Sequence, residues 1–145
     1  MKKGDKAHKK VLVGGVFDIL HYGHIHFLKN AKKLGGHLTV ALESDENVRR
    51  LKGKKRPIHG QNERREMLET LNCVDKVIIL PNKMTDKDYD ALVLKTKPDV
   101  IAVTKGDPML KNKQDQAAKV GAKVVIIPKI NEASTTKIAK ILGLE

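Results

Sequence analysis

Five short apolar runs, rich in valine and isoleucine, constrain the fold of this chain more than any other feature. They cover residues 11–16, 37–42, 76–80, 99–104 and 123–128. Each run is continuous and does not alternate between polar and apolar side chains, a pattern that is typical of strands buried on both faces of a sheet. The runs therefore predict a parallel sheet that is covered by helices on both sides.

Helical patterns separate the runs. Helices are expected over residues 24–34, 61–71 and 111–120, after a cap at Asp86, and after a cap within residues 134–136. Gly35-Gly36 and Gly121 are expected to end two of them. In the helix after Asp86, we expect Tyr89, Leu92 and Val93 to face the core. The last helix is expected to place Ile138, Ile141 and Leu142 on one side.

Strands that alternate with helices favour right-handed crossovers. We therefore predict an α/β fold, a Rossmann-like open parallel five-stranded sheet with helices on both faces. The 145 residues suit one domain, so a single domain is expected over residues 1–145, with residues 1–9 as a flexible basic tail.

The net charge of +12 raises the question of a nucleic-acid partner. Most of the charge lies in two runs: residues 1–10 contain five lysines and one aspartate, and residues 49–65 contain eight lysines or arginines and one glutamate. Aromatic residues make up 3 % and tryptophan is absent, which disfavours stacking platforms for single strands. We expect no nucleic-acid partner.

The cysteine content and the length of the apolar runs indicate the cellular compartment of the protein. Cys73 is the only cysteine, so no internal disulfide can form and a reducing compartment is expected. No run approaches the roughly 18 apolar residues that a membrane span needs. These features predict a cytoplasmic protein with no membrane partner.

In an open parallel sheet, ligands bind at the carboxyl ends of the strands, near the point where the strand order reverses. This places the candidate chemistry in residues 15–24, 43–56, 104–110 and 129–137. The sharpest cluster is His21-Tyr22-Gly23-His24, at the expected start of the first helix. Free backbone N–H groups and the helix dipole favour an anion there, and both imidazoles can donate to phosphate oxygens. No cysteine or third histidine stands at metal-ligand spacing.

These residues resemble the HxGH signature of the cytidylyltransferase-like nucleotidyltransferases, and the resemblance extends along the chain. Residues 47–56, NVRRLKGKKR, look like the lysine-bearing loop that the family places over the triphosphate. Arg64 matches an arginine at the start of the next helix. Residues 97–101, KPDVI, resemble the strand that leads to the nucleobase side of the pocket. Residues 134–138, STTKI, resemble a late motif that holds the outer phosphates.

The resemblance implies direct in-line attack of an acceptor phosphate on the α-phosphate of a nucleoside triphosphate, without a protein nucleophile and with a divalent ion, Mg²⁺, that bridges phosphates. The implied catalytic residues are His21, His24, Lys52 and Arg64. The implied nucleotide-binding residues also include Gly15, Val16, Phe17, Asp18, Gly23, Lys55, Arg56, Asp107, Ser134, Thr135 and Thr136. Lys52, Lys55 and Arg56 are expected on a loop beside the site. A homodimer is compatible with the family.

Some of these roles have alternatives. Phe17 is either part of the core or pocket wall, which is favoured, or catalytic. Asp18 either caps a turn, orients a neighbouring histidine or binds metal. Asp107 aligns with a family aspartate, but Pro108 replaces the usual bulky partner, so the choice between ATP and CTP stays open. Of the two activities, adenylyl transfer is favoured over cytidylyl transfer.

The acceptor has three candidates. Residues 47–58 and the following helix are similar to archaeal-type FAD synthases, which adenylylate FMN, and FMN is favoured because the chain is basic and has no kinase domain. The 47–58 stretch, Lys105-Gly106-Asp107 and STTKI are also similar to the adenylyltransferase domain that acts on heptose 1-phosphate, and glycerol-3-phosphate cytidylyltransferases share STTKI. A nucleotide-binding regulator without turnover is the alternative of another class.

Overall fold

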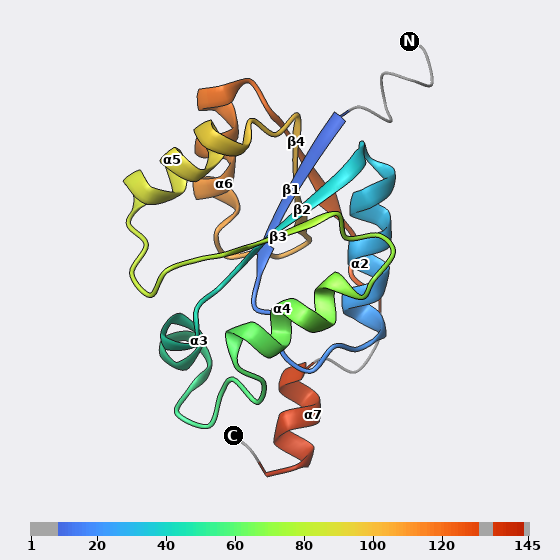
Figure 1. The fold of residues 1–145 in the computed structure, drawn as a ribbon, viewed down its shortest axis with the longest axis vertical. Coiled ribbons are helices and arrows are strands. Elements are labelled where there is room, and N and C mark those ends of the chain that lie inside the picture. Colours follow the sequence, from blue (N-terminus) through green and yellow to red (C-terminus); the bar gives the residue numbers. More distant parts are fainter. Residues whose placement is uncertain (1–8, 131–134, 144–145) are drawn as a thin grey trace.

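The five apolar runs form one parallel sheet with the strand order β3-β2-β1-β4-β5 (Figure 1). The strands are β1 (Lys9–Gly15), β2 (Gly36–Leu42), β3 (Lys76–Ile79), β4 (Val100–Thr104) and β5 (Lys123–Ile127). The computed structural model describes residues 9–130 and 135–143. The predicted open, five-stranded parallel sheet is therefore confirmed, and the expected basic tail lies almost wholly outside the described residues.

Helices cover both faces of the sheet (Figure 1). They are α2 (Tyr22–Lys33), α3 (Asp45–Lys52), α4 (Gln61–Glu69), α5 (Asp86–Thr96), α6 (Leu110–Val120) and α7 (Thr135–Ile141). Helices α2 and α4 pack on one face, and α5 and α6 pack on the other. No helix in the described part of the chain has both the length and the apolar content of a membrane span.

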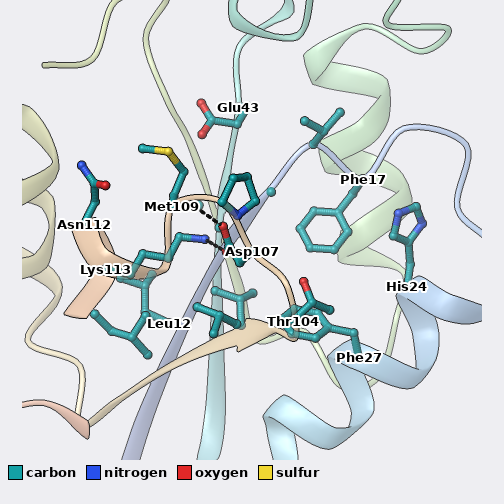
Figure 2. A pocket seen from close by; sticks show the side chains of 18 of the residues that line it. Leu12, Phe17, His24, Phe27, Glu43, Thr104, Asp107, Met109, Asn112 and Lys113 are labelled. Atoms are coloured by element: carbon teal, nitrogen blue, oxygen red, sulfur yellow. Dashed lines mark hydrogen bonds and ion pairs between the residues drawn. The ribbon is translucent and has the colours of Figure 1, made fainter. Parts of the chain in front are cut away.

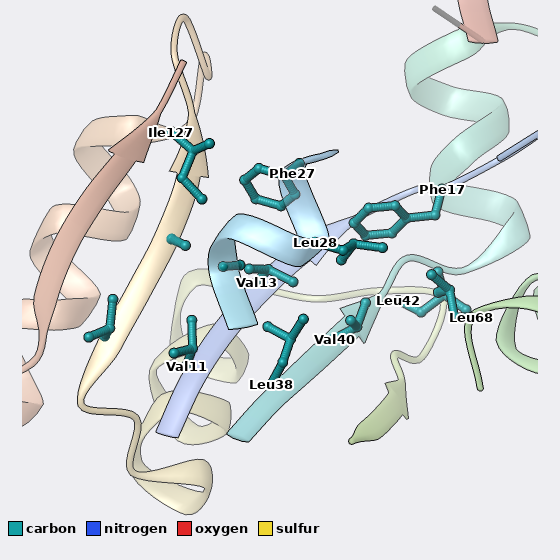
Figure 3. Close-up of a cluster of buried hydrophobic side chains, with 13 residues drawn as sticks. Val11, Val13, Phe17, Phe27, Leu28, Leu38, Val40, Leu42, Leu68 and Ile127 are labelled. Carbon is teal, nitrogen blue, oxygen red and sulfur yellow. The ribbon is translucent and has the colours of Figure 1, made fainter. Parts of the chain in front are cut away.

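The two faces explain why the apolar runs are continuous. Successive side chains of a strand point to opposite faces, so Val11 and Val13 contact the α2 side while Leu12 contacts the α5 side. Figure 3 shows the first cluster, in which Phe27 and Leu28 of α2 lie over β1 and β2. Both sets of side chains are buried, and an alternating pattern would have left one helix layer without apolar partners.

Helix ends follow the predicted signals with one correction. Gly121 ends α6 with φ 70°, a left-handed backbone that glycine adopts without strain. Thr85, and not Asp86, caps α5. Its hydroxyl accepts the backbone N–H of Asp88, whose carboxylate in turn accepts the N–H of Thr85. Asp86 is instead the first residue of the helix.

Helix α3 was not predicted. Residues 47–56 were interpreted as a loop, but their first part continues a helix whose N-cap is Ser44, with the hydroxyl 3.1 Å from the N–H of Asn47. Val48 is the only apolar side chain of α3 that is buried, so its hydrophobic periodicity is too weak to identify a helix from sequence.

Helix α7 differs from its prediction. Ile141 is 82 % exposed and Leu142, just after the helix, is 64 % exposed, so neither joins a core of the described chain. The expected cap at Ser134 lies outside the described residues.

The strand order reverses at β1, since β2 lies on one side of it and β4 on the other. The chain leaves β1 through α2 toward β2, and leaves β4 through α6 toward β5, on the opposite face. Loops at the carboxyl ends of β1 and β4 therefore diverge and leave a crevice.

Candidate active site

A pocket of about 560 Å³ occupies this crevice. Figure 2 shows its walls: Phe17 and His24 on one side, Asp107, Met109 and Lys113 on the other. The residues after β1, β2 and β4 line it, as the sequence analysis predicted from the strand ends.

The two histidines form the N-terminal cap of α2. His21 is the cap residue, and its Nδ1 accepts the backbone N–H of Gly23 at 3.0 Å. Nδ1 of His24 accepts the backbone N–H of His21 at 3.3 Å. This reciprocal arrangement is a capping box, and it brings the ring centroids to 4.0 Å from each other.

The cap also fixes where the imidazole protons reside. A neutral imidazole has one donor and one acceptor nitrogen, so a ring that accepts at Nδ1 carries its proton at Nε2. Both His21 and His24 line the pocket. Helix formation therefore selects the tautomer that presents an Nε2–H donor, the group that a phosphate oxygen requires.

His24 stays neutral over a wide pH range. Burial lowers its pKa, and the nearby charges of His21 and Lys52 lower it further, to about 4. The negative charge of Asp18 opposes this shift. An anion bound at the helix start would favour the protonated form, so ligand binding is expected to raise the pKa of His24.

Glycine is required at position 23. A Cβ on Gly23 would lie 2.7 Å from Cε1 and 3.0 Å from Nδ1 of His21, inside van der Waals contact. The spacing of the signature thus has a local cause, because the ring of the capping histidine covers the second helical residue.

Phe17 belongs both to the core and to the wall of the pocket, which is the interpretation favoured over a catalytic role. It is 7 % exposed, belongs to the core under α2, and meets the ring of His24 edge-on at 5.4 Å. Its φ of 50° is a left-handed conformation that is unusual for a side chain of this size. Gly15 makes room for its ring, since a Cβ there would lie 2.7 Å from Cε2 of Phe17.

Asp18 anchors the segment that follows α3. It is 1 % exposed and accepts hydrogen bonds from Arg56 Nε at 2.9 Å and from the backbone N–H groups of Ile58 and His59. Burial alone would raise the pKa of Asp18, but these bonds outweigh it and hold the pKa below 3.8. Arg56 lies on the loop between α3 and α4, as expected, but it is 2 % exposed and its side chain is bound to Asp18.

Arg64 braces three segments from inside the protein. It is fully buried and donates to the carbonyls of His59 and Val16 and to the carboxylate of Asp45, at 2.9, 2.8 and 2.7 Å. Its bond to Val16 reaches the backbone of the loop after β1. In this arrangement Arg64 supports the pocket from behind and does not line it.

The lysines of the basic run remain accessible. Lys52 ends α3, is exposed and lines the pocket, whereas Lys55 is exposed and donates to the carbonyl of Gly143 at 3.3 Å. Within the basic run, Arg56 and Arg64 are therefore buried and hold the fold, whereas the lysines and Arg49 and Arg50 are exposed.

Asp107 is already engaged on the opposite wall. One carboxylate oxygen accepts the N–H of Met109 at 2.8 Å and the other pairs with Lys113 at 2.6 Å (Figure 2). Lys113 comes from α6 and was not among the predicted site residues. A nucleotide beside Asp107 would meet this ion pair and not a lone carboxylate.

Glu43 is a second pocket residue that the sequence analysis did not identify. It follows β2, within one of the predicted strand-end segments, and accepts from Asn47 Nδ2 at 2.7 Å. The hydroxyl of Tyr89 lies 3.2 Å from its Oε2. Burial, together with the charge and hydrogen bond of Glu43, raises the pKa of Tyr89 to about 12.

The predicted site residues divide between the pocket and its supports. The pocket is lined by Gly15, Val16, Phe17, His21, Gly23, His24, Lys52 and Asp107. Asp18, Lys55, Arg56 and Arg64 do not line it. Ser134 lies outside the described residues, and Thr135 and Thr136 begin α7, with side chains outside the description. The catalytic and binding roles of all these residues stay predictions.

Comparison with known proteins decides the family. The cytidylyltransferase-like family matches residues 12–141. The chain belongs to the cytidylyltransferase-like family. This confirms the resemblance seen in the HxGH segment, and it assigns the chain to the nucleotidyltransferases, enzymes that use a nucleoside triphosphate and a small-molecule acceptor.

Two curated relatives of similar length are FAD synthases. The chain is 41 % identical over 138 residues to the FAD synthase of Pyrococcus abyssi, covering 90 % of each protein. It is 39 % identical to the FAD synthase of Thermococcus sibiricus, over 92 % of this chain and 89 % of that protein. It is also 35 % identical to the bifunctional protein HldE of Geobacter sulfurreducens, covering 97 % of this chain but only 29 % of that protein.

Solved structures agree on the fold. The lipopolysaccharide core biosynthesis protein of Thermoplasma volcanium superposes with a TM-score of 0.69 at 33 % identity, over 86 % of this chain and 98 % of that one. The pantothenate synthetase of Thermus thermophilus superposes with a TM-score of 0.62 at 14 % identity, over 87 % of this chain and 58 % of that one, a likeness in fold alone.

Proposed function

We propose that this cytidylyltransferase-like enzyme transfers AMP from ATP to the phosphate of FMN, forming FAD and pyrophosphate. The observation that supports adenylyl transfer is the pair of capping histidines, whose Nε2–H tautomers are set by the helix start at the pocket. The choice of FMN is supported by FAD synthases of similar length at 39–41 % identity.

In the proposed reaction, an oxygen of the FMN phosphate attacks the α-phosphorus of ATP. A new P–O bond forms as the bond between the α-phosphorus and the bridging oxygen to the β-phosphate breaks, and pyrophosphate leaves with that electron pair. His21 and His24 donate to phosphate oxygens whose charge grows in the transition state. Lys52 holds the outer phosphates at the pocket mouth. Catalysis consists of positioning and charge stabilisation.

Mg²⁺ is proposed to enter with the triphosphate, whose charge it would partly neutralise. Residues 9–130 and 135–143 contain no group of three or more histidine, cysteine, aspartate or glutamate side chains that could hold a metal ion. No protein cage is therefore assigned to it. The absence of nucleic-acid and membrane partners, the homodimer and the cytoplasmic location stay predictions.

An acceptor screen tests the proposal. FMN, heptose 1-phosphate and glycerol 3-phosphate are each incubated with ATP or CTP and Mg²⁺, with pyrophosphate release and chromatographic product identity as readouts. FAD from FMN and ATP, with no comparable release in the other mixtures, is the expected result. Release with heptose 1-phosphate alone would transfer the assignment to the HldE type of adenylyl transfer, and no release with any mixture would favour a nucleotide-binding regulator.

A further inference from the structure

We propose that the isoalloxazine ring of FMN binds between α5 and the sheet, where Glu43 accepts a hydrogen bond from the ring N–H. This inference rests on the proposed function. We call this part of the pocket the α5 chamber. It is lined by Leu12, Ala41, Leu80, Tyr89, Leu92 and Ile101, with Glu43 at its polar end.

Helix α5 packs beside α6 and supplies Tyr89 and Leu92 to the α5 chamber. Of the three residues predicted to face the core, Val93 is fully buried, whereas Tyr89 and Leu92 are half-buried and pack against the same core cluster. The prediction is therefore confirmed, and Tyr89 and Leu92 also line the pocket. Their apolar surfaces face a space that a ligand can fill.

The floor of the chamber suits a flat ligand. Gly14 of β1 and Ala41 of β2 are opposite each other in the parallel register, and both line the pocket. A Cβ added to Gly14 would find its nearest neighbour, the carbonyl oxygen of Ala41, at 3.8 Å, so the small side chains leave open space above the sheet. A broad planar ring can lie on such a surface, with aliphatic side chains of α5 above it.

The charges of the pocket residues decide which part of the substrates enters the α5 chamber. Glu43 and Asp86 line the pocket on the α5 side, so the triphosphate and the FMN phosphate are repelled from it. Lys52 lines the pocket and is near enough to His24 to affect its pKa, while Lys113 of α6 and Lys129, after β5, also line the pocket. The phosphates therefore gather at the histidines and lysines, while an uncharged ring extends into the α5 chamber.

Glu43 is held ready to accept a further hydrogen bond. Asn47 and Tyr89 both donate to it, which fixes the carboxylate, and an ionised carboxylate offers about four acceptor positions. Oxidised isoalloxazine has a single ring N–H, at position 3. A sugar phosphate would need several polar partners here, but the six residues that define the α5 chamber are apolar except for the Tyr89 hydroxyl, with Glu43 at the polar end.

The test measures FMN binding to the full chain by flavin fluorescence and ATP binding by calorimetry, for the wild type, Glu43→Gln and Glu46→Gln. Glu46 is an exposed acid in the first turn of α3 and does not line the pocket, so its variant is a charge-matched control. We expect Glu43→Gln to weaken FMN binding by at least about tenfold, which corresponds to one lost hydrogen bond to a charged group, and to leave ATP binding within about twofold.

A ligand variant isolates the proposed contact. 3-Methyl-FMN lacks the ring N–H, so it should bind the wild type about tenfold more weakly than FMN and should lose little more in Glu43→Gln. Leu92→Trp should block the chamber and weaken FMN binding without affecting ATP binding. Equal FMN affinity for wild type and Glu43→Gln would overturn the inference, as would weakened ATP binding with FMN binding retained. If the wild type neither binds FMN nor forms FAD, the proposed function itself fails.

Discussion

At the residue scale, each histidine of the signature caps α2 with its Nδ1 and therefore carries its proton on Nε2. Nδ1 of His21 and of His24 accept backbone N–H groups of the first turn of α2, so the Nε2–H tautomer follows from helix capping. The glycine between them is needed because the His21 ring covers it. Structure and chemistry can be separated experimentally only by a substitution that keeps the cap.

His21→Asn is such a substitution, because asparagine is a favoured N-cap residue. It should keep the stability of the wild type but lower kcat by at least about 10²-fold, since the phosphate loses one charge-stabilising donor. His21→Ala should lose the same activity and, in addition, about 1 kcal/mol of unfolding free energy. Steady-state pyrophosphate release and urea unfolding measure the two effects. Full activity in His21→Asn would remove His21 from the mechanism.

His24 gives a pH prediction. Its folded-state pKa is about 4, against 6.5 for an unperturbed histidine, so between these values the unfolded chain binds the proton more readily. The stability of the wild type should therefore fall as the pH is lowered from about 6.5 toward 4. Glutamine at the same helix position can keep the capping bond but does not titrate, so His24→Gln should lose less stability over this range. Thermal unfolding at pH 8, 6 and 5 compares the two proteins, and parallel curves would contradict the assignment.

At the element scale, α3 and the segment after it are held by a buried polar network, while their lysines face solvent. Asp18, in the loop after β1, fixes residues 56–59, and Arg64 of α4 bonds to the same loop and to α3. The loop that follows β1 at the pocket is therefore connected to the basic run by buried hydrogen bonds. The residues that make these bonds are far apart in the sequence.

Removing the Asp18 carboxylate should destabilise the protein strongly. Asp18→Ala leaves the Arg56 guanidinium buried without its acid, which should cost about 3 kcal/mol of unfolding free energy in urea. Asp90→Ala is the matched control, because it removes the acid of the more exposed Lys119 pair and should cost far less. Similar losses in both variants would show that Asp18–Arg56 contributes no more than a surface pair.

The lysines of the basic run should be protected by the nucleotide. Lys52, Lys54 and Lys55 are exposed, so trypsin should cut there without ligand and more slowly with ATP and Mg²⁺. Arg56 should resist cleavage in both states, because it is buried and precedes Pro57. Cleavage at Lys83, exposed in the loop before α5, reports any general effect of the ligand. Unchanged rates at all three lysines would assign the run to a solvated surface.

At the scale of the whole molecule, the reversal of strand order at β1 places the pocket between the two helix layers. Helix α2 brings the histidines from one face, and α5 and α6 bring Tyr89 and Lys113 from the other. Two substrates can therefore meet at the carboxyl ends of the strands, one against the residues from each helix layer. The described residues supply cations and N–H donors to this edge, but no metal cage.

Chelation should therefore affect turnover and leave the fold unchanged. Removing divalent ions with EDTA should abolish pyrophosphate release but leave the melting temperature of the ligand-free protein within about 1 °C, since no structural metal would be lost. Adding Mg²⁺ back should restore activity and raise the melting temperature only when ATP is also present. A large drop in the melting temperature on chelation alone would reveal a structural metal site and refute this account.

The sequence by itself determined the sheet, most helices and the capped start of α2. Continuous apolar runs specify strands buried on both faces, and the HxGH spacing specifies a capped helix start, because both signals arise from neighbouring residues. Each of these features was confirmed in the structure, with helix ends displaced by a few residues. The weak apolar periodicity of α3 hid it, since burial of Val48 alone leaves no pattern.

Only the tertiary structure decided which charges face the ligand. Arg56 and Arg64 have the same local signal as the lysines beside them, yet they are buried by Asp18 and Asp45, which are 38 and 19 residues away in the chain. Glu43 and Tyr89, 46 residues apart, meet across the pocket. The α5 chamber likewise depends on how α5 packs beside α6 and against the sheet. Local sequence cannot specify such pairings, because they form only when the sheet brings distant strand ends together.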